Sequence, residues 1–150
     1  MSNVILQGNA SGTGTTTLQS SNTNSTTTLS LPEPAEAATL GFLNIPQNSQ
    51  SGAYTLVITD SGKQIFHPSA DTTARTFTIP ANSSVAFAVG TGITFINQND
   101  AGVVTIAITN DTMRLAGAGT TGSRTLAANG IATCVKVTST EWIISGTGLT

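Results

Sequence analysis

A glycine-rich hexapeptide is the feature of the sequence that comes nearest to a chemical motif. Residues 117–122 are Gly-Ala-Gly-Thr-Thr-Gly and match the G-x-G-x-x-G pattern of dinucleotide-binding loops. That pattern binds a pyrophosphate only where a helix begins directly after it, because the helix N-terminus receives the phosphate charge. Residues 123–126 favour a strand or a turn instead, and the lysine of a P-loop is missing. We therefore expect a flexible surface loop and no bound cofactor.

The single histidine and the single cysteine limit nucleophilic and metal chemistry. His67 stands before Pro68 at the end of a predicted strand, and one histidine makes no metal site unaided, so we expect a hydrogen-bonded structural role. No G-x-S-x-G elbow is present to indicate a Ser-His-Asp triad. Cys134 is alone and forms no intrachain disulfide. The sequence therefore predicts a protein without catalytic residues.

The aspartates of the predicted loops are candidate calcium ligands. Asp60, Asp71, Asp100 and Asp111 lie far apart in the sequence, and none belongs to a D-x-D-x-D-G cluster that directs several oxygens to one ion. Aspartate is common in turns, which accounts for all four. We expect no metal site.

The composition excludes several classes of partner. Charged residues make up 8% of the chain, and five basic residues at a net charge of -2 cannot neutralise a run of phosphates, so we expect no nucleic acid partner. No stretch approaches the roughly 18 apolar residues of a membrane span, and the first residues do not resemble a signal peptide. We expect synthesis in a cytoplasm and no membrane insertion.

Threonine, serine and asparagine provide 54 of the 150 residues, and the abundance of β-branched residues favours extended backbone. From residue 52 onward, strand-like segments recur at about the 8 to 12 residue spacing of sandwiches and barrels. The predicted strands are residues 54–59, 63–67, 76–79, 85–89, 93–97, 103–109, 113–115, 131–138 and 141–145. Turns are predicted at residues 60–62, 99–102 and 128–130. The expected fold class is all-β, with a compact antiparallel β-sandwich or barrel domain over residues 51–150.

Alternation of side chains within these strands indicates which faces close the core. The expected apolar faces are Phe77 with Ile79, Val85 with Phe87 and Val89, and Ile131 with Thr133, Val135 and Val137. In the last of these strands the opposing residues are Ala132, Cys134 and Lys136. We expect the aromatic residues in the core, with Trp142, close to the chain end, open to partial exposure.

The first third of the chain has a different character. Residues 1–32 contain no Asp, Glu, Lys or Arg, and three short strand-like pieces occur at residues 4–6, 15–18 and 26–31. Thr-Thr-Thr-Leu occurs twice at an offset of 11 residues, either as a repeated strand-turn unit or by coincidence in a threonine-rich chain. The few apolar side chains do not offset an ordering entropy of about 1–2 kcal/mol per residue. We therefore expect residues 1–50 to form an attachment arm and linker that another molecule orders.

The linker and the sheet edges each leave two interpretations open. Residues 32–46 form either one short helix, with prolines at its start, or an extended connection. Lysines and prolines that protect sheet edges are scarce, so either neighbouring subunits occupy the edges of an obligate oligomer, or bulges and short strands protect them. The residues expected to bind partners are apolar: Val4, Ile5, Leu6, Leu18, Leu29, Leu31, Phe42, Leu43 and Ile45.

Several segments resemble one protein family in combination. Residues 3–14, 22–25 and 29–32 resemble the opening of tailed-bacteriophage virion proteins, and the likeness continues through residues 54–56, 60–63, 77–85 and 137–146. The resemblance implies a non-enzymatic structural protein exposed on the particle, either a capsid decoration (cement) protein or a tail or head fibre, and commonly a trimer. Thr27 and Glu33 stand where the family often has Arg and Asp, so the contacts of the arm are expected to differ from those of relatives.

These lines lead to a functional expectation. The arm docks by adding strands to a neighbouring subunit or to the particle shell, and the β domain forms an outward knob on the virion surface. The expected partners are copies of the chain itself, as a homotrimer, and the major capsid protein or a tail protein of the same virion. The alternative is a fibre or receptor-binding tip that contacts a host surface glycan through loops such as residues 71–74 and 117–123.

Overall fold

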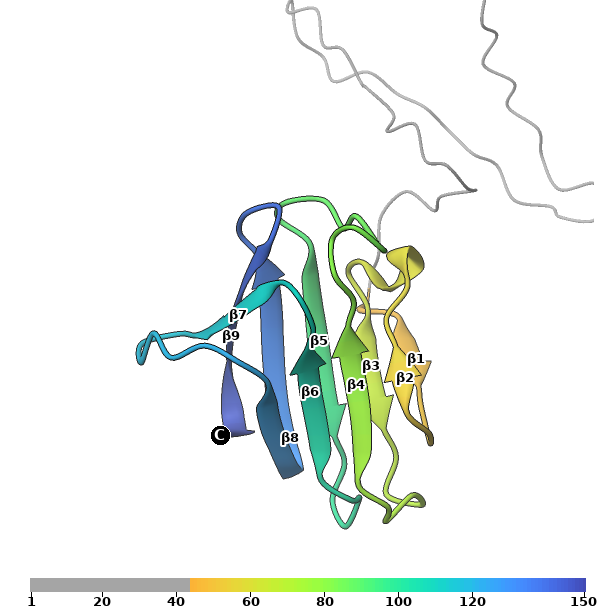
Figure 1. Cartoon of the computed structure of the whole chain (residues 1–150). Helices are drawn as coiled ribbons and strands as arrows, with labels where there is room; N and C mark the ends of the chain where they lie inside the picture. Colours follow the sequence, from red (N-terminus) through yellow and green to blue (C-terminus); the bar gives the residue numbers. More distant parts are fainter. Residues whose placement is uncertain (1–43) are drawn as a thin grey trace, which may run out of the picture. The chain divides into compact units, whose positions relative to one another are not determined.

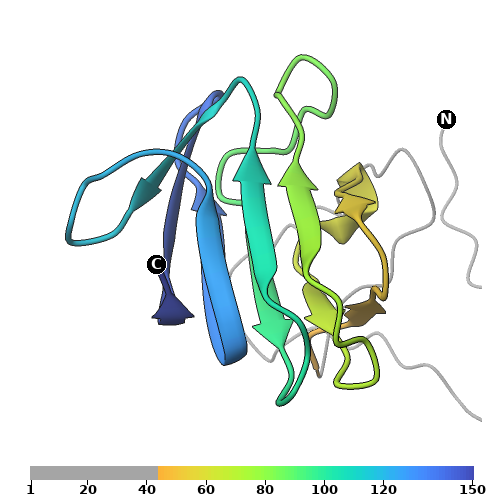
Figure 2. The same cartoon turned by 60° about the horizontal axis from the view of Figure 1, so that its bottom comes forward.

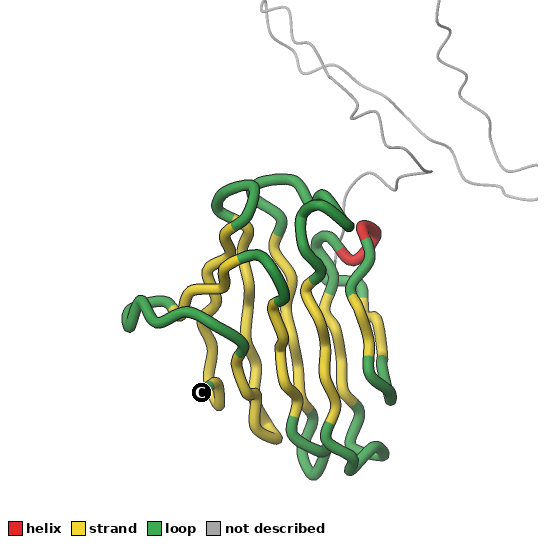
Figure 3. Tube along the Cα trace, viewed as in Figure 1, coloured by secondary structure: helices red, strands yellow, loops and turns green. Residues whose placement is uncertain are grey.

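The computed structural model describes residues 44–150, which form one curled nine-stranded sheet and one short 3-10 helix (Figure 1). Strands and loops account for nearly all of this part of the chain (Figure 3). The strands are β1 Gln47–Ser49, β2 Tyr54–Thr55, β3 Gln64–His67, β4 Arg75–Ile79, β5 Gly92–Asn97, β6 Val104–Ile108, β7 Thr112–Leu115, β8 Arg124–Lys136 and β9 Glu141–Leu149, and the 3-10 helix is η1 Ile58–Asp60. The all-β prediction is confirmed for these residues, and the predicted strands of the arm lie outside them.

Six strands form two parallel rows. β1, β3 and β5 are neighbours in one row, and β2, β4 and β6 are neighbours in the other. The chain alternates between the rows, so every pair of consecutive strands from β1 to β6 adds one strand to each row. The two rows lie one behind the other in Figure 1.

β8 connects the two rows at one end. Its residues 131–135 pair antiparallel with β5, and its residues 124–126 pair antiparallel with β6. β9 pairs antiparallel with β8, and β7 lies parallel to β9. The result is a curled mixed sheet that forms a half-barrel (Figure 2).

The prediction of antiparallel pairing is wrong for most of the sheet. Five of the eight strand pairings in the described residues are parallel. Hairpins would pair consecutive strands, as β8 and β9 do, but from β1 to β6 the chain crosses to the opposite row after each strand. The strand in that row serves as the crossover that parallel neighbours require. Apolar alternation is the same in both arrangements, so the sequence pattern did not distinguish them.

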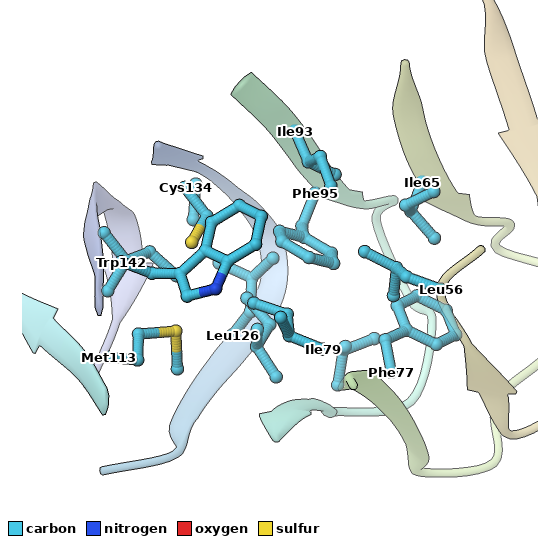
Figure 4. Close-up of a cluster of buried hydrophobic side chains, with 14 of the residues drawn as sticks. Leu56, Ile65, Phe77, Ile79, Ile93, Phe95, Met113, Leu126, Cys134 and Trp142 are labelled. Atoms are coloured by element: carbon cyan, nitrogen blue, oxygen red, sulfur yellow. The ribbon is translucent and has the colours of Figure 1, made fainter. Parts of the chain in front are cut away.

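The core lies between the rows and extends under β7 and β9 (Figure 4). Phe77 and Ile79 point inward as predicted. Trp142 is fully buried and meets Phe87 edge to face, with ring centroids 5.6 Å apart, so the core holds the one aromatic for which partial exposure was open. The remaining members of the core cluster are Leu56, Ile65, Ile93, Phe95, Val104, Ile106, Met113, Leu126, Ala132, Cys134 and Ile144.

The predicted strand at residues 85–89 is a loop. The amides of Ser84 and Val85 both donate to the carbonyl of Ala81, which closes a turn before the segment. Phe87 is buried in the core and Val85 packs against it partly buried, while Val89 is 64% exposed. The alternating pattern was misleading because one aromatic anchor produces it without a sheet neighbour.

The predicted turn at residues 128–130 is a bulge inside β8. The register of β8 against β9 shifts between Leu126 and Ile131, and Asn129 has a positive φ of 61°. Gly130 is tightly enclosed, because a Cβ there would lie 2.6 Å from Leu126 Cδ1. The bulge bends β8, so the strand reaches β6 with its first residues and β5 with its last.

Candidate interaction surface

β8 presents its more apolar face to solvent. Ala132, Cys134 and Lys136 are buried, whereas Ile131 is 48% and Val135 is 38% exposed. The prediction that the β-branched face of this strand closes the core is therefore wrong. Period-two alternation identifies two faces of a strand, and the space available between the rows decides which one enters the core.

Two of the inward side chains of β8, those of Ala132 and Cys134, are small because large rings already occupy the core beside them. Trp142 lies opposite Lys136 in the register of β9, and Phe95 lies opposite Ala132 in the register of β5. Burial of Cys134 raises the pKa of its thiol to about 12, so the thiol is protonated at neutral pH and inert.

Lys136 is buried with its charge satisfied. Its Nζ donates to Asn82 Oδ1 at 2.7 Å and lies 5.4 Å from the ring centroid of Trp142. The aliphatic stem can then pack in the apolar interior while the ammonium keeps a polar and an aromatic partner. A lysine that would ordinarily protect the outside of a strand is used inside.

The outward side chains of four neighbouring strands, β3, β5, β8 and β9, form what we call the apolar face. Its apolar members are Phe66, Ile96, Ile131, Val135 and Ile143, and its polar members are Gln64, Thr94, Thr133 and Ser145. Ile131 stands beside Ile96, which stands beside Phe66, and Val135 stands beside Ile143, so the apolar side chains form two rows across the strands.

The apolar face carries no charged side chain among these nine residues. At its margin, Arg114 of β7 and Glu141 of β9 are joined by an ion pair of 2.7 Å between Nε and Oε1 and neutralise each other. In the middle, the hydroxyls of Thr94 and Thr133 bond to each other at 3.1 Å. The central polar atoms thus have a partner without water.

The outward side of the second row of strands, β2, β4 and β6, carries hydroxyl groups instead of apolar side chains. Thr76, Thr105 and Thr125 stand side by side on β4, β6 and β8, and Thr55 and Thr78 form a shorter row beside them. We call these five residues the threonine face. Hydroxyl groups keep this face hydrated, so the two outer sides of the sheet differ in how much they gain from being covered.

His67 has the hydrogen-bonded strand-end role that the sequence predicts. The amide of Asn97 donates to the carbonyls of Gly102 and Leu126, so its Oδ1 accepts from His67 Nδ1 at 2.9 Å. The other ring nitrogen lies 3.1 Å from Asp71 Oδ2. His67 has no exposed surface and is held in the fold by these two contacts.

Asp71 also binds Arg75, with its Oδ2 2.6 Å from Arg75 Nε and its Oδ1 3.1 Å from Nη2. The guanidinium holds the pKa of Asp71 well below its ordinary value of 3.8, against an opposing effect of burial, and the bond from His67 adds to the lowering. These contacts fix the loop between β3 and β4.

A second polar cluster lies at the opposite end of the rows. Asp60 is buried and accepts from Tyr54 Oη at 2.7 Å, from Asn48 Nδ2 at 2.9 Å and from the amide of Val57 at 2.9 Å. Burial first, and then Asp60, raises the pKa of Tyr54 above its ordinary value of 10.0. This cluster ties η1 to β1 and β2.

The glycine-rich hexapeptide belongs to the loop between β7 and β8, which extends away from the sheet in Figure 1. Arg114 Nη1 donates to the carbonyl of Gly119, and Arg124 Nη2 donates to that of Thr120. β8 begins at Arg124, so a strand follows the loop, as the sequence predicts, and no helix N-terminus faces it. Two arginines hold the base of the loop, and residues 116–121 are exposed.

The described residues hold neither a cluster of metal ligands nor a membrane-spanning helix. No three His, Cys, Asp or Glu side chains in residues 44–150 come together as possible metal ligands. In the same residues no helix is long and apolar enough to cross a membrane.

Of the nine residues predicted to bind partners, the structure places one. Ile45 lies before β1 with 55% of its surface exposed, and the other eight, from Val4 to Leu43, lie outside the described residues. The apolar face was not predicted, because the alternation of residues 131–137 distinguishes the two faces of the strand but not which of them enters the core.

No protein-family model matches the chain, and no curated protein matches it significantly.

Proposed function

We propose that the chain is a non-enzymatic structural protein of a tailed-bacteriophage virion, a trimeric capsid decoration protein that docks through its N-terminal arm. The observation that supports this most strongly is the apolar face, because a chain that keeps Ile131 and Val135 outside and Lys136 inside is suited to being covered by another molecule. The bonding of His67 into the fold is in keeping with a protein that performs no reaction.

In this proposal the two parts of the chain divide the work. The arm, the part of residues 1–50 that precedes β1, attaches to the major capsid protein by strand addition, with Leu18, Leu29 and Leu31 setting the register. Residues 51–150, together with β1, which pairs with β3, form the knob on the virion surface. Because the arm has hardly any charge, attachment depends weakly on salt.

The test is particle occupancy of full-length arm variants. Leu29→Asp with Leu31→Asp places charges on one side of the predicted strand at residues 26–31, and Thr28→Asp with Ser30→Asp places the same charges on the other side. We expect the leucine variant to lose at least tenfold in copies per particle and the control to lose much less. Quantitative mass spectrometry of purified particles measures both. Full occupancy by the leucine variant would contradict the docking role of the arm.

The second candidate function is a tail or head fibre or a receptor-binding tip. The exposed loop between β7 and β8 favours it, because the bonds from Arg114 and Arg124 hold small and hydroxylated residues out in solvent. Binding of labelled glycans, lost in Thr120→Val with Thr121→Val, together with a tail position in particle images, would select this candidate over decoration.

A further inference from the structure

We propose that the apolar face is the surface through which copies of this chain pack against one another. The inference deepens the proposed function, on whose trimer it rests, by naming the interface. Its occupant is a second copy of the chain.

The first step is the cost of leaving this face in water. Ile131 is 48% exposed in the middle of β8, while Val135 and Ile143, 38% and 37% exposed, are register neighbours near the end of β8 and the start of β9, and Val137, just beyond β8, is 38% exposed. These residues belong to the two apolar rows, which the polar row of Thr94, Thr133 and Ser145 separates, and exposed apolar residues gathered on one side of a sheet, unlike isolated ones, are typical of interaction sites.

The second step is that β8 reverses the usual distribution of polar and apolar residues in a strand that has one face in solvent. Such a strand places polar residues outside, whereas β8 buries Lys136 and exposes Val135. The interior does not need the β-branched residues, since Ala132 and Cys134 fill it beside the rings of Phe95 and Trp142. The outward position of the β-branched side chains is therefore left for an external contact.

The third step identifies the occupant by charge. A basic or acidic partner calls for an opposite charge, and the apolar face offers none, because its nearest ions, Arg114 and Glu141, are paired with each other. A neutral surface is electrostatically compatible with a copy of itself. The bond between Thr94 and Thr133 also lets the centre be covered without leaving these two hydroxyls unpaired.

The fourth step is size. Six consecutive strands, in the order β1, β3, β5, β8, β9 and β7, at about 4.8 Å spacing make this side of the sheet roughly 25 Å across. A standard protein interface buries about 800 Å² on each partner, which is a patch of roughly 28 Å on a side. The side of the sheet that bears the apolar face is thus on the scale of one stable interface.

The experiment compares two double variants of the full chain by sedimentation velocity. Val135→Lys with Ile143→Lys alters register neighbours on the apolar face, and Thr76→Lys with Thr105→Lys alters register neighbours on the threonine face. We expect an oligomeric wild type, at least a tenfold weaker association of the apolar-face variant, and no change in the control. A monomeric wild type, or an apolar-face variant that associates as strongly as the wild type, overturns the inference.

A second measurement needs only a small change to the surface and remains decisive if the lysine variant fails to fold. Pyrene attached to Thr133→Cys on the apolar face should show excimer emission between copies, while pyrene on Thr76→Cys of the threonine face should not. Cys134 is buried and stays unlabelled in the native protein. Equal emission from both sites, or none from Thr133→Cys, contradicts packing at the apolar face.

The two proposals fail in different ways. A wild type that is monomeric in solution yet decorates particles overturns the self-association and leaves the proposed function standing. An oligomer that Val135→Lys with Ile143→Lys disperses, but that never appears on particles, supports the interface and contradicts the virion role. A monomer whose position 133 resists labelling overturns the inference in favour of residues 1–43 as the cover.

Discussion

Asp71 contacts two basic side chains, those of His67 and Arg75, at the loop after β3, and its contribution to the stability of the fold depends on pH. Its pKa is held below the ordinary 3.8 chiefly by Arg75, so the folded state binds its proton less readily than the unfolded chain does. The stabilisation from this carboxylate is therefore fully present above about pH 4 and is lost as the pH falls toward its lowered folded pKa. Acid destabilisation should begin at this loop.

The prediction is that Asp71→Asn lowers the urea midpoint of unfolding at pH 7 and flattens its fall below pH 4. Asp100→Asn is the matched control, because Asp100 lies in an exposed turn and bonds only to Asn99 among the side chains of the described residues. Urea titrations at several pH values measure both variants against wild type. If Asp71→Asn and wild type lose stability in parallel between pH 4 and pH 2, the role given to the Arg75 contact is wrong.

At the scale of single elements, β8 depends on its bulge. The bend between Leu126 and Ile131 lets one strand pair with both rows, and Gly130 sits inside it with no room for a side chain. A Cβ at Gly130 would lie 2.6 Å from Leu126 Cδ1 and 2.7 Å from the carbonyl oxygen of Ala127, and backbone cannot move aside as easily as a side chain.

We therefore expect Gly130→Ala to lower the free energy of unfolding by about 1–3 kcal/mol, the usual cost of overpacking. Gly52→Ala is the control, since an added Cβ there meets nothing within 4 Å. Chemical denaturation of both variants at neutral pH measures the difference. A Gly130→Ala protein as stable as the control would mean that the bulge is pliable and does not fix the join between the rows.

The strands also show how much of the fold can be predicted from the sequence. Alternation correctly placed Phe77 and Ile79 in the core, because their opposing residues are threonines and only one face of β4 is apolar. In β8 both faces contain apolar residues, and the choice between them depends on Phe95 and Trp142, which lie on other strands. Strand direction could not be predicted either, since apolar and polar residues alternate in the same way in parallel strands and in hairpins.

The candidate surface was out of reach of the sequence for the same reason. Ile131 and Val135 looked like core residues, and they form part of the apolar face because the register of β5, β8 and β9 brings them beside Ile96 and Ile143. A property of four adjacent strands cannot be deduced from the period of one. The lone His67 was predictable, because a single histidine before a proline at a strand end has few other roles.

At the scale of the whole molecule, the apolar face ties stability to concentration. If copies cover it, folding is linked to association, and the folded state gains by mass action as the protein concentration rises. A neutral interface of β-branched side chains should also respond little to added salt, unlike an assembly held by ion pairs.

We expect the melting temperature of the wild type to rise by roughly 2–5 °C for each tenfold increase in concentration, the shift that a trimer of domains this size would show. Val135→Lys with Ile143→Lys should melt at one temperature at every concentration, because its copies repel one another, while Thr76→Lys with Thr105→Lys should follow the wild type. Differential scanning fluorimetry from micromolar to tens of micromolar protein measures all three. A wild-type melting temperature independent of concentration would mean that the chain folds alone, and it would contradict the packing of copies at the apolar face.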